Sequence, residues 1–202
     1  MKKFYSVLSG LLVLALIIFE IPELRRFSSL IADGNSGYVG ELVAKIFFVI
    51  AIAASSALLI WGKKSRIAAI CLTAAGGVAV YKTFIYVVNI IGNEMVFGIV
   101  LGNIIDMLEL VFFIAPATVI LLLSKKASEK NVFGSLIATL SAFVLGIAGR
   151  IITFVSWGKS FASDFPLFFS AYGTDILRTL VMFAAFALLL LSFIPEKIKK
   201  RK

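Results

Sequence analysis

Two carboxylates lie three residues apart in an otherwise apolar stretch of the chain, GNIIDMLELVFF. Asp106 and Glu109 fall on one face of a helix, because residues three or four apart are neighbours there. Gly98 and Gly102 fall on the same face, and glycines at this spacing let membrane helices approach closely. We therefore expect both carboxylates to point into a helix bundle, where they can form ion pairs or bind a polar solute.

Basic and polar residues that could meet these carboxylates lie in the neighbouring apolar segments. The candidate binding residues are Lys82, Tyr86, Asn89, Asp106, Glu109, Arg150 and Arg178. A charge at such a depth costs about 2.5–3.5 kcal/mol on insertion scales, which is tolerable only if the group is paired or hydrated. We expect Asp106 and Glu109 to contact Lys82, Arg150 or both, directly or through water.

Structural roles are the alternative for these charges. Two pairs lie near the ends of apolar segments, Lys45 with Glu41 and Arg178 with Asp175, and Glu20 lies at a similar level in the first segment. The two end pairs are typical of interface residues that bury their stems and extend their charges to the surface. The deeper pairs have two interpretations. They clamp helices together as ion pairs, or they form a functional site, which is the default hypothesis for ionisable groups at this depth.

The composition indicates which elements position these residues. The chain has 202 residues, of which 61% are hydrophobic and 15% charged, with a mean hydropathy of +1.06. Soluble domains keep roughly a quarter of their residues charged, so we expect an integral membrane protein. Six apolar segments are long enough to cross a hydrocarbon layer of about 30 Å. They are 4–21, 39–61, 67–91, 97–123, 132–157 and 174–194.

These segments predict one all-α transmembrane domain over residues 1–202, built as a six-helix bundle. A weak internal repeat is also present, because residues 38–64 align without gaps to 100–126 and match a glycine, a Lys-Lys pair and several apolar positions. This repeat favours an organisation as three tandem two-helix hairpins.

The basic residues predict the orientation of the bundle. Thirteen of the 20 Lys and Arg residues lie at the N-terminus, at 63–66, at 125–130 and at 197–202, which are alternate ends of the segments. By the positive-inside rule both termini are cytoplasmic, and Asn35 and Asp164 lie outside. The net charge of +9 therefore serves topology and attraction to lipid headgroups, not nucleic-acid binding. We expect a multi-pass protein of the cell membrane, most simply a bacterial plasma membrane.

Two outer connections have an amphipathic or aromatic character. Residues 22–37 begin at Pro22, contain an apolar face and end at Gly34-Asn35, which predicts a short helix lying in the interface. Residues 158–173 contain five aromatic side chains, with Pro166 soon after Asp164 as a helix start. We expect this second connection to pack on the outer mouth of the bundle.

Catalysis is the least supported class of function. The chain has no histidine and Cys71 is its single cysteine, so no imidazole is present for proton relay or metal binding. No motif combines a nucleophile with a base. We therefore expect no enzyme activity, no catalytic residue, no metal site and no cofactor.

The favoured function is the binding or transport of a small polar solute, zwitterionic or anionic, in a charge-lined pocket open to the outside. The alternative is a non-catalytic subunit or scaffold of a larger membrane complex, whose polar stripes bind partner helices. In span count, length, inside termini and long first outer loop, the chain resembles the substrate-binding subunits of energy-coupling-factor vitamin transporters. Those subunits carry an alanine pattern in their first helix, whereas the first segment here has only Ala15.

Overall fold

The fold is all-helical, as the sequence predicts. The computed structural model describes residues 2–62, 66–91, 97–123, 127–156 and 164–194. These residues form helices α1 (Lys2–Ala32), α2 (Val39–Ile60), α3 (Arg66–Ile91), α4 (Phe97–Leu123), α5 (Glu129–Ser156) and α6 (Phe165–Leu191), with a short 3-10 helix η1 (Ser36–Tyr38) before α2. The bounds of α2, α3 and α4 agree with the predicted segments to within one residue.

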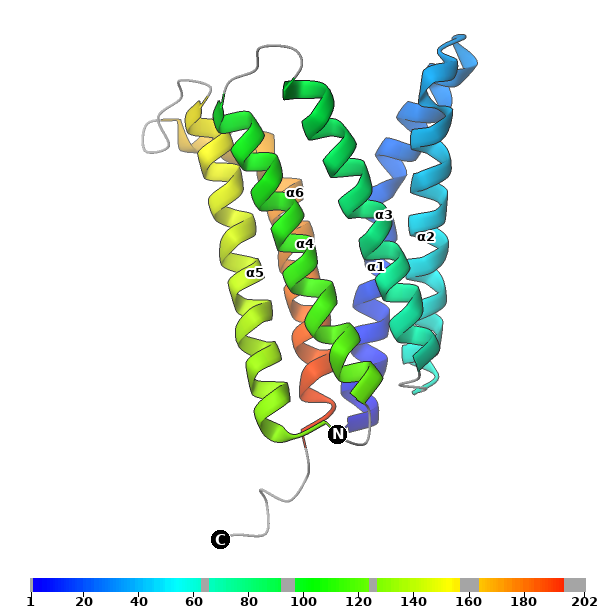
Figure 1. Cartoon of the computed structure of the whole chain (residues 1–202), viewed down its shortest axis with the longest axis vertical. Helices are drawn as coiled ribbons and strands as arrows, with labels where there is room; N and C mark the ends of the chain where they lie inside the picture. The colour runs from blue at the N-terminus through cyan, green and yellow to red at the C-terminus, as the bar shows by residue number, and fades with distance from the viewer. Residues whose placement is uncertain (1, 63–65, 92–96, 124–126, 157–163, 195–202) are drawn as a thin grey trace, which may run out of the picture.

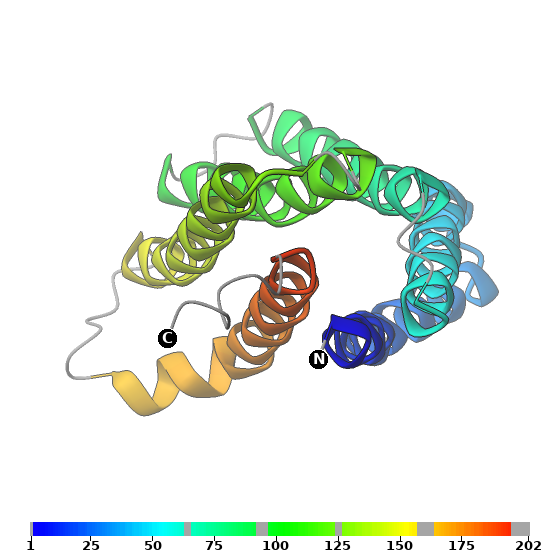
Figure 2. The same ribbon diagram turned by 90° about the horizontal axis from the view of Figure 1, so that it is seen from below.

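The helices pack as a ring. Each helix contacts the next one along the chain, α6 returns to contact α1, and α4 and α6 also touch. Figure 2 shows the other helices as an arc that α6 closes between α5 and α1. The start of α1 and the end of α6 lie at the same end of the ring, which we call the lower end after Figure 1, and the α1–α2 connection lies at the upper end.

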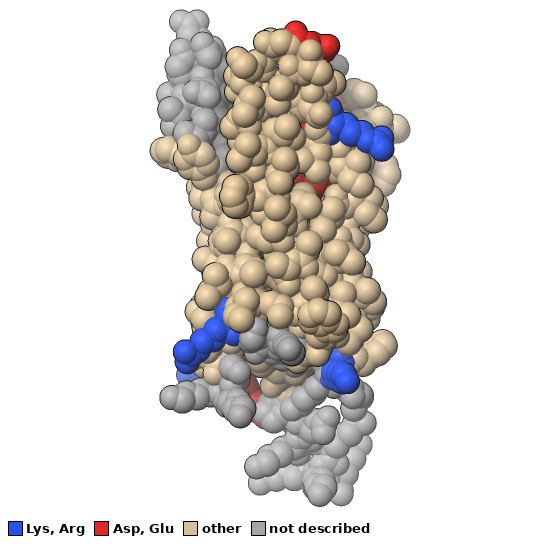
Figure 3. All heavy atoms as spheres, turned by 90° about the vertical axis from the view of Figure 1, so that its right-hand side faces the viewer, with Lys and Arg blue, Asp and Glu red and all other residues tan. Residues whose placement is uncertain are grey.

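The helices are suited to a membrane. Four of them, α1, α2 with η1, α5 and α6, are long and apolar enough to cross a bilayer, and the described parts of α3 and α4 contain shorter apolar helices at Arg66–Val78 and Met107–Leu123. Figure 3 shows a face whose middle band is almost free of charged atoms, while Lys, Arg, Asp and Glu gather toward its two ends. The protein is therefore a membrane-embedded helical bundle.

The first helix is longer than the sequence predicts. The expected break at Pro22 and a separate interface helix over 22–37 are both wrong, because α1 continues through Pro22 to Ala32. Its 31 residues correspond to about 46 Å of helix, more than the hydrocarbon layer needs. Proline removes one backbone hydrogen bond, but a long helix tolerates this loss where a neighbour packs along it, as α2 does here.

The predicted stop at Gly34-Asn35 does end this helix. Gly34 has a φ of +92°, a left-handed conformation that glycine adopts without a Cβ penalty. The Asn35 N–H donates to the Leu30 carbonyl and the Gly34 N–H to the Ile31 carbonyl, both at 3.0 Å. This is a Schellman motif, which satisfies carbonyls at the helix end and turns the chain toward α2.

The described part of the second connection packs on the bundle, as predicted. Helix α6 begins at Phe165 with Asp164 as its N-cap and proline in its first turn, nine residues before the predicted segment 174–194. Phe168 is buried at 3% exposure, and its ring centroid lies 5.3 Å from that of Phe154 on α5. Residues 157–163 lie outside the described part of the chain. The first turns of α6 therefore pack against α5 through aromatic side chains.

An apolar core fills the lower half of the ring. Its most buried large members are Val13, Leu16, Ile52, Leu59, Leu72, Phe113, Leu121, Phe186 and Leu189. Small residues bring α1 and α2 together: a Cβ on Gly10 would lie 2.8 Å from an Ile60 side-chain atom, and Ser56 Oγ donates to the Gly10 carbonyl at 2.7 Å. Among the described residues, apolar side chains and close contacts at small residues thus join the helices of the lower half.

Candidate functional site

A polar cluster joins α4, α5 and α6 above this core. The Glu109 cluster consists of Glu109 on α4, Arg150 and Gly146 on α5, and Thr179 on α6. Arg150 Nη1 donates to Glu109 Oε2 at 3.0 Å, and Thr179 Oγ1 donates to Glu109 Oε1 at 2.6 Å. The exposed fractions are 2% for Glu109, 7% for Arg150 and 0% for Thr179. Both carboxylate oxygens are therefore held by buried donors from two other helices.

Gly146 provides the space for this carboxylate. A Cβ built on Gly146 would lie only 2.6 Å from each oxygen of Glu109, closer than real side chains approach. The same residue contributes a polar contact, because Arg150 Nη1 also donates to the Gly146 carbonyl one turn earlier in α5. The spacing of four residues thus places a gap and a guanidinium on one face of α5, and Glu109 occupies the gap.

Aromatic side chains close the cluster above and below. Toward the lower end, Phe113 is one helical turn from Glu109, and its ring stacks on Phe186 of α6 with centroids 6.0 Å apart. Toward the upper end, Phe154 is one turn from Arg150 and packs against Phe168 and Tyr172 of α6. Glu109 and Arg150 are almost fully buried between these layers, and charge interactions strengthen where water is excluded. The ion pair therefore lies in an apolar environment.

A second set of charges lies between α1, α2 and α6. The Glu20 cluster consists of Glu20 and Glu23 on α1, Lys45 on α2 and Arg178 on α6. Lys45 Nζ contacts Glu20 Oε2 and lies 2.5 Å from Glu23 Oε2, while Arg178 Nη2 lies 3.4 Å from Glu20 Oε1. Glu20 is buried, whereas half of the Glu23 side chain is exposed. Two carboxylates thus face two basic groups.

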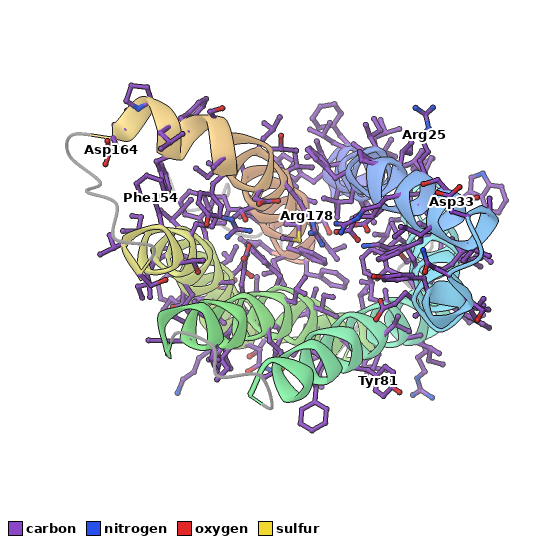
Figure 4. The ribbon with its side chains drawn as sticks, turned by 90° about the horizontal axis from the view of Figure 1, so that it is seen from above. Arg25, Asp33, Tyr81, Phe154, Asp164 and Arg178 are labelled. Atoms are coloured by element: carbon purple, nitrogen blue, oxygen red, sulfur yellow. The ribbon has the colours of Figure 1, made fainter. Side chains whose placement is uncertain are left out.

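Helix α6 connects the two clusters through consecutive residues. Arg178 contacts Glu20 on α1 and Thr179 contacts Glu109 on α4, so neighbouring side chains on one turn reach two different helices. Figure 4 views the molecule from the upper end and shows Arg178 within the ring, whereas Tyr81 and Arg25 point away from it. The position of α6 is therefore fixed by polar contacts to α1 on one side and to α4 on the other.

The predicted site residues are divided between the two clusters. The predicted contact between Glu109 and Arg150 is confirmed. Arg178 instead joins the Glu20 cluster, between α1 and α6. The side chains of Lys82, Tyr86, Asn89 and Asp106 lie outside the described part of the structure, so their contacts with this site remain predictions.

The interpretation of Lys45 as a surface residue that extends its charge to the interface is wrong. Lys45 is 8% exposed, and its ammonium group contacts carboxylates of α1 instead. Burial of the ammonium is possible because α1 continues as a helix past residue 20 and brings both acids beside α2. The continuous helix at Pro22 therefore explains this error as well.

Sequence reasoning did not identify Thr179. The one signal available was its place directly after Arg178, as a lone hydroxyl before an apolar run. A helical hydroxyl commonly bonds its own backbone, so the sequence alone does not indicate that Thr179 reaches another helix. Glu23 was also missed, although it shares a face with Glu20 at a spacing of three.

Two surface hollows lined by described residues lie away from both clusters. A hollow of about 540 Å³ runs between α4 and α5 near Pro116, lined by small and apolar residues together with Asn131 and Ser135. Another, of about 400 Å³, lies between the start of α5 and Ile194. Neither contains Glu109 or Arg150. Glu109 and Arg150 contact each other at 3.0 Å, so a solute that forms ion pairs with both by inserting between them must separate these side chains.

The chemistry of the described site is that of charge and hydrogen bonding. Among the residues whose positions are described, no three His, Cys, Asp or Glu side chains come together as ligands for a metal ion. Comparison of the chain with protein-family models, with curated proteins and with solved structures finds no match. Function must therefore be inferred from the geometry of the two clusters.

Proposed function

We propose that this protein binds a small polar solute, zwitterionic or anionic, at the Glu109 cluster and carries it across the cell membrane. The observation that supports this proposal is the enclosed contact of Glu109 with Arg150 and Thr179. It lies where three helices meet, between two aromatic layers. Ionisable groups inside membrane bundles are rare and costly, and a functional site is the default hypothesis for them.

The apolar core supports a binding role over a purely structural one. Small residues and apolar side chains already join the helices in the lower half. Replacing a buried ion pair by apolar residues of similar volume is often neutral or stabilising, so ion pairs are weak evidence for stability. The contact of Glu109 with Arg150 is therefore better explained by a binding role than by a need for stability.

The proposal includes a topology of six spans with both termini in the cytoplasm. In single-cysteine variants of a Cys71→Ser chain, Asn35→Cys and Asp164→Cys are expected to react with an impermeant reagent added outside, whereas Lys64→Cys and Lys126→Cys react only after permeabilisation. The expectation follows from the excess of Lys and Arg at alternate segment ends. Reaction of position 35 only from the cytoplasmic side contradicts the arrangement.

Solute binding itself is tested on the purified chain. We expect a small zwitterion or anion to raise the thermal unfolding midpoint in detergent, with a stabilisation of about 2.7 kcal/mol at a concentration 100-fold above its Kd. A panel of amino acids, carboxylates, amines and neutral polar solutes covers the classes to be compared. Arg150→Met removes the basic partner and should abolish the effect, while Lys130→Met, an exposed residue of the same helix, should retain it.

The alternative function, a subunit that binds partner helices, is favoured by the hollow between α4 and α5. Gly134 and Ala138 line it at helical spacing, and a Cβ on Gly134 would meet no atom within 4 Å. Small residues at this spacing are typical of helix contacts in membranes. A chain that binds none of the panel, and that is isolated only together with another membrane protein, supports this second function and contradicts the first.

A further inference from the structure

The charges and spacing of the Glu109 cluster allow its solute to be described more narrowly. Resting on the function proposed above, we infer that the solute is a compact α-zwitterion that inserts between Glu109 and Arg150, its ammonium on the carboxylate and its carboxylate on the guanidinium and on Thr179. The inserted molecule exchanges one internal ion pair for two ion pairs with the protein.

Electroneutrality favours a zwitterion over a simple ion. Glu109 and Arg150 carry opposite charges in contact at 3.0 Å and are 2% and 7% exposed. Among the described residues of the cluster these two charges balance, so a bound anion would add an excess negative charge, and a bound amine an excess positive charge, beside an almost fully buried pair. An uncompensated buried charge is strongly unfavourable. A zwitterion adds no net charge, so each charge of the site keeps an opposite partner.

The donors of the site match a carboxylate ligand. Arg150 Nη1 and Thr179 Oγ1 donate to the two oxygens of Glu109. The same two donors could bind the carboxylate of a solute. Guanidinium and hydroxyl groups are suited to carboxylate recognition by charge-assisted hydrogen bonds. When the solute carboxylate takes over these two donors, both oxygens of Glu109 become available to accept from an ammonium group.

The distance between the partners favours an α-zwitterion. Covalent geometry places the nitrogen of an α-amino acid only about 2.5 Å from its carboxyl carbon. A longer spacer between the two charged groups would force α4 and α5 further apart. Helix α4 approaches α5 closely here, because the Glu109 carboxylate lies against the backbone of Gly146. A solute whose ammonium and carboxylate are joined by the shortest spacer therefore requires the smallest separation of α4 and α5.

The aromatic layers limit the size of the solute. The stacked pair Phe113–Phe186 closes the cluster below, and Phe154 with Phe168 closes it above. Phe113 and Phe154 each lie one helical turn from the ion pair along their own helices, so a solute that inserts there with a large side chain would have to displace one of these aromatic pairs. Glycine, alanine or an amino acid of similar size fits these limits.

The inference is tested by the binding of four probes to the full chain in detergent, measured by calorimetry. Alanine has both charged groups, propionate only the carboxylate, ethylamine only the ammonium, and γ-aminobutyrate has both groups with a longer spacer. We expect alanine to bind at least about 100-fold more tightly than propionate or ethylamine, because a site built for a polar group strongly rejects an analogue that lacks it. Affinity for γ-aminobutyrate should lie between these limits.

A conservative variant tests the placement of the carboxylate without removing a charge. Thr179→Val keeps the shape of the side chain and removes the donor, so alanine affinity should fall about tenfold. Thr139→Val is the matched control, because Thr139 is also buried but donates to the Ser135 carbonyl of its own helix. If both variants lose alanine affinity to a similar degree, Thr179 does not bind the solute carboxylate, and the proposed placement of that carboxylate is overturned.

The outcomes separate this inference from the proposed function. Equal affinity for alanine and for either single-charge probe overturns the α-zwitterion and leaves a solute-binding protein. Binding of a different solute from the wider panel, with no binding of alanine, also overturns the α-zwitterion and leaves a solute-binding protein. If no solute of any class binds, both the inference and the proposed function fail.

Discussion

Arg150→Met alone is expected to lower the free energy of unfolding by about 3–5 kcal/mol, because it leaves the Glu109 carboxylate buried without its counter-charge. Glu109 is 2% exposed and remains in contact with the Thr179 hydroxyl, which does not neutralise it. Denaturant titration in mixed micelles, followed by circular dichroism, measures the change. Lys130→Met removes an exposed charge of the same helix and should change the value by no more than about 0.5 kcal/mol.

The double variant Arg150→Met with Glu109→Met should recover most of this loss. Both charges are then replaced by flexible apolar side chains, and no buried ion remains unpaired. Recovery combined with loss of solute binding indicates that the pair serves function and not stability. A double variant as unstable as the single one shows instead that the contact itself holds α4 to α5, and contradicts the binding interpretation.

The helices could be predicted because each carries a signal within its own sequence. Apolar length located all six, and the bounds of α4 were predicted without error. Break and cap signals were less reliable. Gly34 ends α1 through a backbone motif that glycine favours, but Pro22 does not break it, since packing against α2 outweighs one lost hydrogen bond. Local sequence cannot report that packing.

The candidate site could be predicted only in part, for a similar reason. Helical spacing shows which residues share a face, and depth shows which charges need a partner, so the contact of Glu109 with Arg150 followed. Spacing does not show which helix lies opposite. Lys45 was therefore not matched to Glu20, and Thr179 was not recognised as a donor to Glu109. The first contact depends on the continuation of α1 past Pro22, and the second on the packing of α6 against α4.

Gly146→Ala is expected to abolish solute binding and to lower the free energy of unfolding by about 1–3 kcal/mol, the usual range for overpacking. The new Cβ would lie 2.6 Å from both oxygens of Glu109, so the carboxylate must rotate away. Rotation relieves the clash but breaks the contacts with Arg150 and Thr179. Gly134→Ala is the matched control on α5, because its Cβ meets nothing within 4 Å, and it should stabilise the helix by up to about 1 kcal/mol.

A double-mutant cycle identifies the cause of that loss. In a Glu109→Ala chain the carboxylate is absent, so Gly146→Ala has nothing to displace and should be neutral or slightly stabilising, like Gly134→Ala. The effect of the same substitution thus changes sign with the residue at 109. If Gly146→Ala is equally harmful in both backgrounds, the added methyl group disturbs the packing of α5 against its other neighbours, and the carboxylate is not what Gly146 accommodates. A change of sign shows that the absence of a side chain at 146 is what places the Glu109 carboxylate between Arg150 and Thr179.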